Sequence, residues 1–415
     1  MRVSGVAGRL ADTLRPIVGG DLPVRLRAWD GSESGPAGAP LVTLNSPQAI
    51  SRLFWRPGEL GAAQAYVSGE IDVDGDLDRA LTHVWSVADE RGLQGIRPTP
   101  AVAGALLKVL REVGRPPSPP ASQARVRGRL HSKLRDRRAI SHHYDLSNEF
   151  YSLILDDSMA YSSGYWRSDD PAYTLADAQR DKLSLILDKL GLEPGMTMLD
   201  VGCGWGSLSL HAAARGIRVV GVTIAAEQKK FIDDRIFAYG LEDGVEIRLQ
   251  DYRDVEGEFD AVASVEMGEH VGERNYPTYV EVLRRSVRPG GRVLVQQMSR
   301  RGRHPGGGPF IESFIAPDMH MRPIGETVAL FENGGLEVRD VHALREHYVR
   351  TVQAWIEAFE SNIDRITALV GEEVARVWRL YLVGGGMAFR DGRMGVDQIL
   401  AVRPGAHTVP PVRTW

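Results

Sequence analysis

The residues that most clearly indicate a binding site form a glycine-rich turn near the middle of the chain. The turn reads Leu199-Asp-Val-Gly-Cys-Gly-Trp-Gly206, with glycines at the alternate positions Gly202, Gly204 and Gly206. An apolar run precedes it, and a segment compatible with a helix, 207–215, follows it. This pattern is typical of a buried strand that ends in a tight turn, where missing side chains let a ligand approach the backbone. The start of the following helix adds free N–H groups.

The spacing of the glycines indicates the kind of ligand. A dinucleotide site usually reads G-x-G-x-x-G, because a pyrophosphate must be cradled. This turn instead resembles motif I of the methyltransferases that use S-adenosylmethionine (SAM). Asp200, within the turn, either fixes its conformation or faces the ammonium group of the cofactor. A structural turn with incidental glycines is the alternative interpretation, and the motifs described next argue against it.

The elements that must position this turn follow from the hydrophobic pattern. Apolar strand segments at 219–223, 245–249, 261–265 and 292–296 alternate with helical segments such as 225–239. This alternation predicts a parallel sheet with helices on both faces, in which ligands bind at the carboxyl ends of the strands. A turn is expected at 289–291, before the last of these strands. Polar residues stand at the predicted strand ends: Gly202 to Gly206, Thr223, Asp251-Tyr252 and Glu266 to His270.

The length of the chain, 415 residues, favours two domains. Strand-like alternation and a helix predict a small α+β domain over residues 1–113. Residues 114–138 form a linker that is first proline-rich and then basic. The basic part is either a solvated helix or a contact with an anionic surface, and the sequence leaves both open. Residues 139–415 form the predicted α/β domain.

Composition and charge exclude several classes of protein. The 43% hydrophobic and 25% charged residues are typical of a globular protein, and a net charge of −4 gives no indication of nucleic-acid binding. The single cysteine, Cys203, excludes an intramolecular disulfide and a multi-cysteine metal site. His142, His143 and His270 are expected to form hydrogen bonds, not to hold a metal, because adjacent histidines rarely chelate one ion. Without a predicted membrane span or signal peptide, the protein is expected to be cytoplasmic.

Together the motifs resemble a known family, the cyclopropane fatty acid synthases and their relatives that methylate unsaturated acyl chains. The resemblance covers roughly 139–415, and the first domain is similar through 65–72 to the lipid-facing domain of longer members. It implies an α/β, Rossmann-like class I SAM methyltransferase fold with a small α+β N-terminal domain. The matching segments are His143-Tyr-Asp-Leu-Ser-Asn148, Tyr161-Ser162, Leu199 to Gly206, Val222 to Gln228, Gln250 to Asp254, Glu269 to Gly272 and Asn275 to Tyr279.

The resemblance implies which residues hold SAM. Thr223 would form a hydrogen bond near the ribose, where many methyltransferases have an acid, and Gln228 would substitute for that acid. The implied set is Tyr161, Ser162, Asp200, Gly202, Gly204, Gly206, Thr223, Gln228, Tyr252 and Arg253.

The resemblance also implies a reaction. Methyl transfer to an alkene creates a carbocation that must lose a proton, and cyclopropane synthases are thought to use a bound bicarbonate as the base. The residues that hold it in the family are a Cys, a Glu, a His and a Tyr, with a backbone group. In this sequence the four side chains become Ser163, Glu269, Gln296 and Tyr348. Glutamine cannot carry a proton as histidine does, which puts the bicarbonate in doubt.

The loss of the Cys and the His has two interpretations. One is drift within a cyclopropane synthase that keeps its bicarbonate. The other, which we favour, is a changed fate of the cation, in which a hydride shift and loss of a proton from the new methyl group give a methylene branch. This resembles the actinobacterial members that convert oleoyl chains to 10-methylene stearoyl lipids, which a separate flavoprotein reduces to 10-methylstearate.

The expected partners follow from this resemblance. They are a phospholipid surface at the inner face of the membrane, a flavin-dependent reductase that acts on the product, and a second copy of the chain in a homo-oligomer. A non-catalytic subunit that binds SAM and lipid is an alternative, against which Glu269 and Tyr348 argue. A small-molecule or nucleic-acid methyltransferase is a further alternative, but no base-reading motif supports nucleic acid as a partner.

Overall fold

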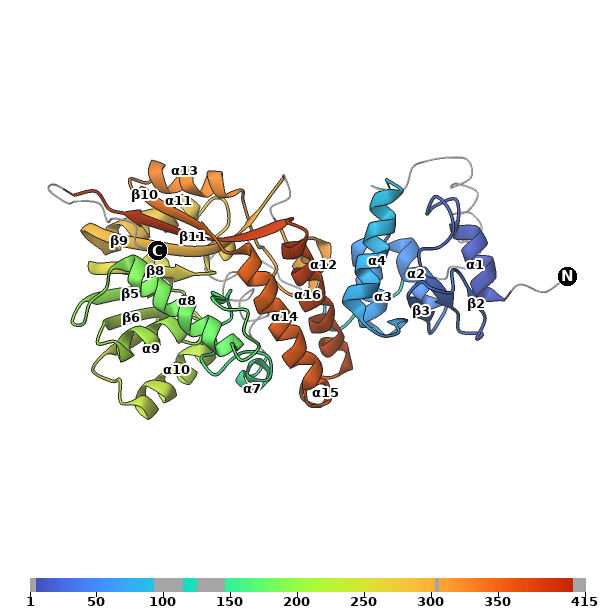
Figure 1. The fold of residues 1–415 in the computed structure, drawn as a ribbon, viewed down its shortest axis with the longest axis horizontal. Coiled ribbons are helices and arrows are strands. Elements are labelled where there is room, and N and C mark those ends of the chain that lie inside the picture. Colours follow the sequence, from blue (N-terminus) through green and yellow to red (C-terminus); the bar gives the residue numbers. More distant parts are fainter. Residues whose placement is uncertain (1–4, 93–114, 125–145, 303–305, 406–415) are drawn as a thin grey trace. The chain divides into compact units, whose positions relative to one another are not determined.

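The computed structural model describes residues 5–92, 115–124, 146–302 and 306–405. The chain divides into two compact units (Figure 1). The first comprises Met1–Gln123 with Gly371–Met387, and the second Ala124–Val370 with Ala388–Trp415. The predicted basic stretch and the pair His142 and His143 lie outside the described residues.

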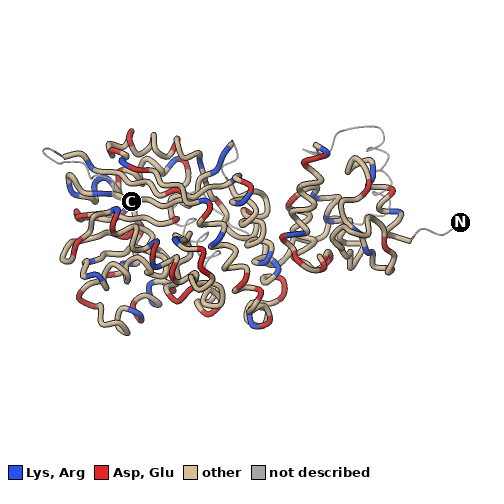
Figure 2. Tube along the Cα trace, viewed as in Figure 1, with Lys and Arg blue, Asp and Glu red and all other residues tan. Residues whose placement is uncertain are grey.

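Charged residues of both signs are interspersed along the two units (Figure 2). In the described part of the chain, no helix has both the length and the apolar character that a membrane span requires.

The first unit contains a small sheet with the strand order β2-β1-β3-β4. β1 runs parallel to β3, and the outer strands run antiparallel to their neighbours. Leu26, Leu44 and Ile50 belong to the apolar core that joins this sheet to its helices. The predicted combination of helices and strands in a small N-terminal region is confirmed. Its elements are α1 (Val6–Leu14), β1 (Arg25–Arg27), β2 (Glu33–Ser34), β3 (Leu41–Leu44), α2 (Gln48–Trp55), α3 (Glu59–Val67), β4 (Ile71–Val73) and α4 (Leu77–Glu90).

A helix from the far end of the chain completes the first unit. Most of α16 (Glu372–Arg390) belongs to this unit. Arg376 Nε donates to the backbone oxygen of Tyr66 (2.6 Å), and its Nη2 donates to that of Ile71 (2.7 Å). The guanidinium also lies 4.2 Å from the centre of the Tyr66 ring. The residue pattern did not indicate this return, because nothing local distinguishes α16 from the helices before it.

The second unit contains a seven-stranded sheet with the order β10-β11-β9-β8-β5-β6-β7 (Figure 1). The strands from β9 to β7 run parallel, as predicted. β11 runs antiparallel to both of its neighbours. No strand was predicted at β10 or β11, so the predicted parallel sheet corresponds to the strands from β5 to β9. The helices between β10 and β11 begin and end at the same edge of the sheet, so β11 must run back. The strands are β5 (Thr197–Val201), β6 (Arg218–Thr223), β7 (Val245–Leu249), β8 (Phe259–Val265), β9 (Val287–Arg300), β10 (Glu337–Ala343) and β11 (Met394–Val402).

Helices cover both faces of this sheet. On the inner strand β5, Leu199 packs in one buried cluster with Tyr279 of α11. The neighbouring Met198 packs on the other face with Leu187 of α8 and Leu208 of α9. Alternate strand residues thus build two apolar cores, as expected for a sheet buried on both faces. The helices are α7 (Asn148–Ser152), α8 (Leu175–Leu190), α9 (Ser207–Ala214), α10 (Ala226–Tyr239), α11 (Tyr276–Ser286), α12 (Pro309–Phe314), α13 (Ile324–Asn333), α14 (Arg345–Ser361) and α15 (Ile363–Val370), with short 3₁₀ turns η1 (Tyr252–Asp254) and η2 (Gly268–His270).

Segment 289–291, predicted as a turn, lies within β9. The register shifts there, because Phe259 pairs with Val287 whereas Ala261 pairs with Arg292. The extra residues of β9 form hydrogen bonds with the chain that follows β11, from Gly290 N to Arg403 O (2.7 Å) and from Arg403 N to Gly291 O (3.1 Å). The prediction of a turn is therefore wrong, since a long-range partner continues the strand.

Candidate active site

The glycine turn follows β5 at the carboxyl edge of the parallel strands. Gly202 and Gly204 have positive φ angles of 77° and 55°, which other residues rarely adopt. A side chain at Gly204 would meet no atom within 4 Å, so this glycine leaves its backbone open to the adjoining cavity. A side chain at Gly202 would come within 2.7 Å of Met267 Cγ. The turn thus offers bare backbone to a ligand, as its sequence predicted.

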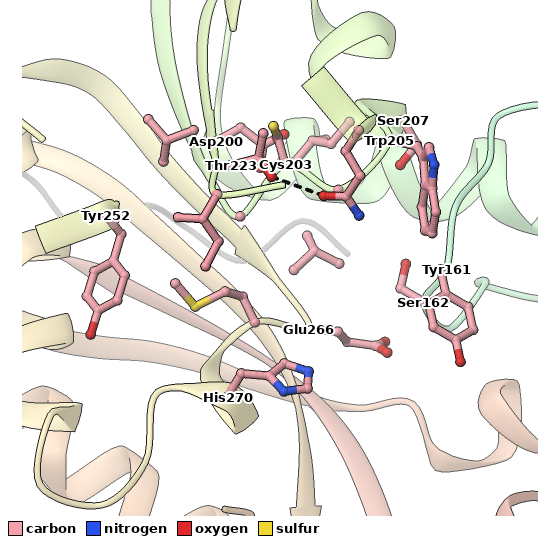
Figure 3. Close-up of a pocket in the computed structure, with 18 of the residues that line it drawn as sticks. Tyr161, Ser162, Asp200, Cys203, Trp205, Ser207, Thr223, Tyr252, Glu266 and His270 are labelled. Carbon is pink, nitrogen blue, oxygen red and sulfur yellow. Dashed lines mark hydrogen bonds between the residues drawn. The ribbon is translucent and has the colours of Figure 1, made fainter. Parts of the chain in front are cut away.

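A cavity adjoins this turn (Figure 3). All of the implied cofactor residues except Gly206 line the cavity: Tyr161, Ser162, Asp200, Gly202, Gly204, Thr223, Gln228, Tyr252 and Arg253. Gly206 does not line it and is the N-cap of α9. The implied residues that line the cavity come from four separate segments, and their convergence on one cavity fits the cofactor that the sequence implied.

The side chains that follow β6 and β7 are held by local hydrogen bonds. Thr223 Oγ1 donates to Gln228 Oε1 (3.0 Å), so the two implied ribose contacts also bind each other. Arg253 donates from Nε and from Nη2 to the Asp251 carboxylate, each at 2.7 Å. The charge of Arg253 is therefore balanced by a neighbouring acid, and Tyr252 lies across the cavity from Tyr161 (Figure 3).

Asp200 joins the turn to the helix behind it. Its Oδ2 accepts a hydrogen bond from Ser209 Oγ of α9 (2.7 Å). The side chain lines the cavity but is only 1% exposed to solvent. Burial raises the pKa of Asp200 to about 6, against the opposing effects of Ser209 and Lys182. Of the two predicted roles, fixing the conformation is visible in the structure, and the carboxylate remains close enough to the cavity for the other.

Glu266 is an acid at the carboxyl edge that accepts hydrogen bonds on both carboxylate oxygens. It follows β8 directly and has a positive φ of 50°. Its Oε1 accepts from the backbone N of Ser163 and from Gln296 Nε2, each at 2.9 Å, and its Oε2 accepts from the Tyr348 hydroxyl at 2.7 Å. The carboxyl group points toward the side of the cavity that holds Tyr161 and Ser162 (Figure 3). Burial raises the pKa of Glu266, and the hydrogen bonds from Ser163, Tyr348 and Gln296 oppose that rise.

Glu269 lies three residues further along and has different surroundings. Its Oε1 accepts from the backbone N of Met298, and its Oε2 has no hydrogen-bond partner among the described residues. The side chain is 1% exposed and is not among the residues that line the cavity. Burial raises the pKa of Glu269 to about 8, and the negative charge of Glu266 adds to the rise. A carboxyl group in this state is largely protonated near pH 7.

Comparison with known proteins identifies the family. Residues 131–399 match the family described as mycolic acid cyclopropane synthetase. The chain belongs to this family. Its relatives include a probable fatty acid methyltransferase of Mycobacterium tuberculosis, which is 37% identical over 95% of each chain. The tuberculostearic acid methyltransferase UfaA1 of the same organism is 36% identical over 92% of this chain and 88% of its own length. The cyclopropane-fatty-acyl-phospholipid synthase of Escherichia coli is 34% identical over 87% of each.

Solved structures of the family confirm the predicted fold class. The cyclopropane synthase MmaA2 of M. tuberculosis covers 66% of this chain with a TM-score of 0.61 and 28% identity, over its own full length. The mycolic acid cyclopropane synthase CmaA1, in complex with SAH (S-adenosylhomocysteine) and CTAB, covers 64% with the same TM-score and 30% identity, over 98% of its length. The second unit therefore has the class I SAM methyltransferase fold.

Ser163, Gln296 and Tyr348, which the sequence grouped with Glu269 around a base, donate to Glu266 instead, Ser163 through its backbone N and the other two through their side chains. The Ser163 hydroxyl donates to the backbone oxygen of Gly164. Sequence reasoning placed Glu266 at the ligand-binding edge of the sheet but gave it no role. The available signal was its position: it is the first residue after β8, where ligands of α/β sheets bind.

A second glutamine continues this network. Gln398 Nε2 of β11 donates to Gln296 Oε1 (3.0 Å), while Gln296 Nε2 donates to Glu266. Both glutamines are fully buried on paired positions of β9 and β11. A carboxylate only accepts hydrogen bonds, so this series of hydrogen bonds runs in one direction, from Gln398 through Gln296 to Glu266. Gln398 therefore orients the amide of Gln296 toward Glu266.

Proposed function

We propose that this protein methylates the double bond of an oleoyl chain in a phospholipid and releases a 10-methylene acyl chain. Membership of the family makes it a SAM-dependent methyltransferase of fatty acyl chains. The proposal adds the lipid-bound substrate and the methylene product. It rests above all on one observation, the Glu266 carboxylate held by donors from Ser163, Gln296 and Tyr348.

Bound SAM supplies an electrophilic methyl group next to the acyl double bond. After transfer, the acyl chain carries a positive charge on the carbon adjacent to the methylated one. The rings of Tyr161 and Trp355, with centroids 5.3 Å apart, belong to an aromatic cluster beside Glu266 and Tyr348. Aromatic faces of this kind stabilise nearby cations.

The proposed base is the carboxylate of Glu266. The positions where the family resemblance puts bicarbonate ligands direct their donors onto this side chain. A carboxylate that belongs to the protein therefore receives the hydrogen bonds that a bound bicarbonate would need. Glu266 accepts a proton from the new methyl group, and the C–H electron pair forms the second bond of the methylene group. This proposal replaces bicarbonate with a residue of the chain.

The same geometry favours a methylene product. Hydrogen bonds to both oxygens of Glu266 lower its affinity for a proton compared with an unbonded buried carboxylate. Slower deprotonation gives time for a hydride to move from the methylated carbon to its cationic neighbour. Loss of a proton from the methyl group then gives the methylene branch, whereas immediate loss gives a ring.

Product analysis tests this function. Purified protein is incubated with SAM and vesicles of oleoyl phosphatidylglycerol, and the acyl chains are examined by mass spectrometry and proton NMR. Vinylic protons of a methylene branch are expected. Upfield ring protons would instead assign the cyclopropane product, for which the similarity to the E. coli synthase is the supporting observation. Absence of S-adenosylhomocysteine with every unsaturated lipid would support a non-catalytic subunit.

The substrate also defines the proposed partners. An acyl chain in a phospholipid requires a peripheral contact with the inner face of the membrane, and a methylene product is the substrate for a flavin-dependent reductase. A homo-oligomer remains part of the proposal.

A further inference from the structure

Lys182 is a buried cation beside the glycine turn to which neither the motifs nor the family resemblance gave a role. It lies on α8, lines the cavity and is 1% exposed. Its ammonium group donates to Ser162 Oγ at 2.8 Å. Within the described ranges of the chain, that is its one hydrogen bond, and it forms no ion pair. A lysine can donate three hydrogen bonds, so two donors of a desolvated cation are unused.

Such a cation needs an anion, because burying an unpaired charge is costly. The second lysine of α8 shows the usual solution. Lys189 is fully buried and pairs with Asp340 Oδ2 at 3.2 Å. Arg253, which also lines the cavity, pairs with Asp251. Lys182 therefore differs from both: its partner is expected to come from the cavity.

We infer that Lys182, together with Ser162, binds the carboxylate of the methionine moiety of SAM. This carboxylate is the single anionic group of the cofactor. Ser162 lies on the side of the cavity opposite Tyr252 (Figure 3), and Lys182 is hydrogen-bonded to Ser162. Thr223 and Gln228 form the implied ribose contact. The amino-acid end of the cofactor then lies at Lys182, with its ammonium group toward Asp200. Lys182 fixes the direction in which SAM enters the cavity.

The charges around Lys182 are consistent with this role. Burial lowers the pKa of Lys182 to about 8, while Glu266, Asp156 and Asp200 oppose the decrease. The ammonium form therefore predominates at neutral pH, and deprotonation above about pH 8 removes the charge that attracts a carboxylate.

Binding measurements test the inference without depending on the acyl substrate or product. Isothermal titration calorimetry compares SAM with decarboxylated SAM, which keeps the sulfonium and the ammonium but lacks the carboxylate. The wild type is expected to bind decarboxylated SAM about 10- to 100-fold more weakly, as for loss of a hydrogen-bonded charge. Lys182→Met is expected to weaken the binding of SAM by a similar factor and to change the affinity for decarboxylated SAM by less than about threefold. Lys230→Met, which removes an exposed lysine of α10, is the matched control and should change neither affinity.

Two outcomes overturn the inference: Lys182→Met weakens the binding of both ligands equally, or it weakens the binding of neither. If Lys182→Met does not fold, as judged by circular dichroism, the wild type alone provides the test. Its preference for SAM over the decarboxylated ligand should decline as the pH rises above about 8, and a constant preference contradicts the inference. A negative result in these binding measurements does not affect the proposed methylene product, because product analysis tests that proposal separately.

Discussion

The two sides of the cavity are assembled in different ways. On the cofactor side, one contiguous turn, 199–206, contributes five of the residues that line the cavity: Asp200, Gly202, Cys203, Gly204 and Trp205. On the side of the proposed base, Glu266 receives hydrogen bonds from residues 103, 30 and 82 positions away along the chain. The cofactor side is therefore centred on a local motif, whereas the hydrogen bonds of the base side exist only in the folded sheet. Substitutions on the base side should change the chemical step and leave cofactor binding nearly intact.

The largest effect is expected for Glu266→Gln. The amide keeps the shape but cannot accept a proton, so kcat should fall about 10²- to 10⁴-fold, the usual contribution of a general base. The affinity for S-adenosylhomocysteine, measured by calorimetry, should change less than about threefold. If kcat remains within tenfold of the wild type in a folded variant, the base is not Glu266.

Tyr348→Phe removes one donor to the Glu266 carboxylate. Hydrogen bonds to a charged group contribute about 1.5 kcal/mol or more, so kcat near neutral pH should fall roughly tenfold. The donor stabilises the ionised form and lowers its pKa, so its loss should raise the pKa of Glu266. The acidic limb of the pH–kcat profile should therefore move to higher pH. A parallel loss of rate at every pH would point to a role in packing.

Gln398→Leu tests whether the second glutamine acts through Gln296. Loss of one neutral hydrogen bond should reduce kcat about three- to tenfold, because the amide of Gln296 is no longer oriented toward Glu266. Gln398→Asn is the conservative control, and a water between the shorter amide and Gln296 should restore part of the rate. An unchanged acidic limb of the pH–kcat profile in Gln398→Leu would contradict a positioning role.

Glu269→Gln should have the smallest effect. Because the pKa of Glu269 is raised to about 8, its carboxyl group is already mostly protonated near neutral pH, and the amide resembles that form. We expect kcat within about threefold of the wild type at pH 7. A loss as large as that of Glu266→Gln would restore the role that the sequence analysis gave to Glu269.

The sequence predicted the elements around the glycine turn closely because their signals are local. The boundaries of β7 agree with the predicted ones, and those of β6, β8 and α10 agree within a residue or two. The strands at the other edge of the sheet, β10 and β11, were not predicted, and the antiparallel direction of β11 depends on where the preceding helices end. Two glutamates in one segment, Glu266 and Glu269, have the same chemistry in the sequence. In the folded chain they differ, because Glu266 lines the cavity and accepts hydrogen bonds on both oxygens, whereas Glu269 does not line the cavity and accepts on one.

The central claim is that a carboxylate of the chain, and not bicarbonate, removes the proton. The most direct test is the initial rate of S-adenosylhomocysteine formation on oleoyl phosphatidylglycerol vesicles in buffers freed of carbon dioxide, with and without added bicarbonate. The rate should be the same in both, because Glu266 already receives the donors that bicarbonate would need. A rate that collapses without bicarbonate and recovers when it is added would contradict the claim.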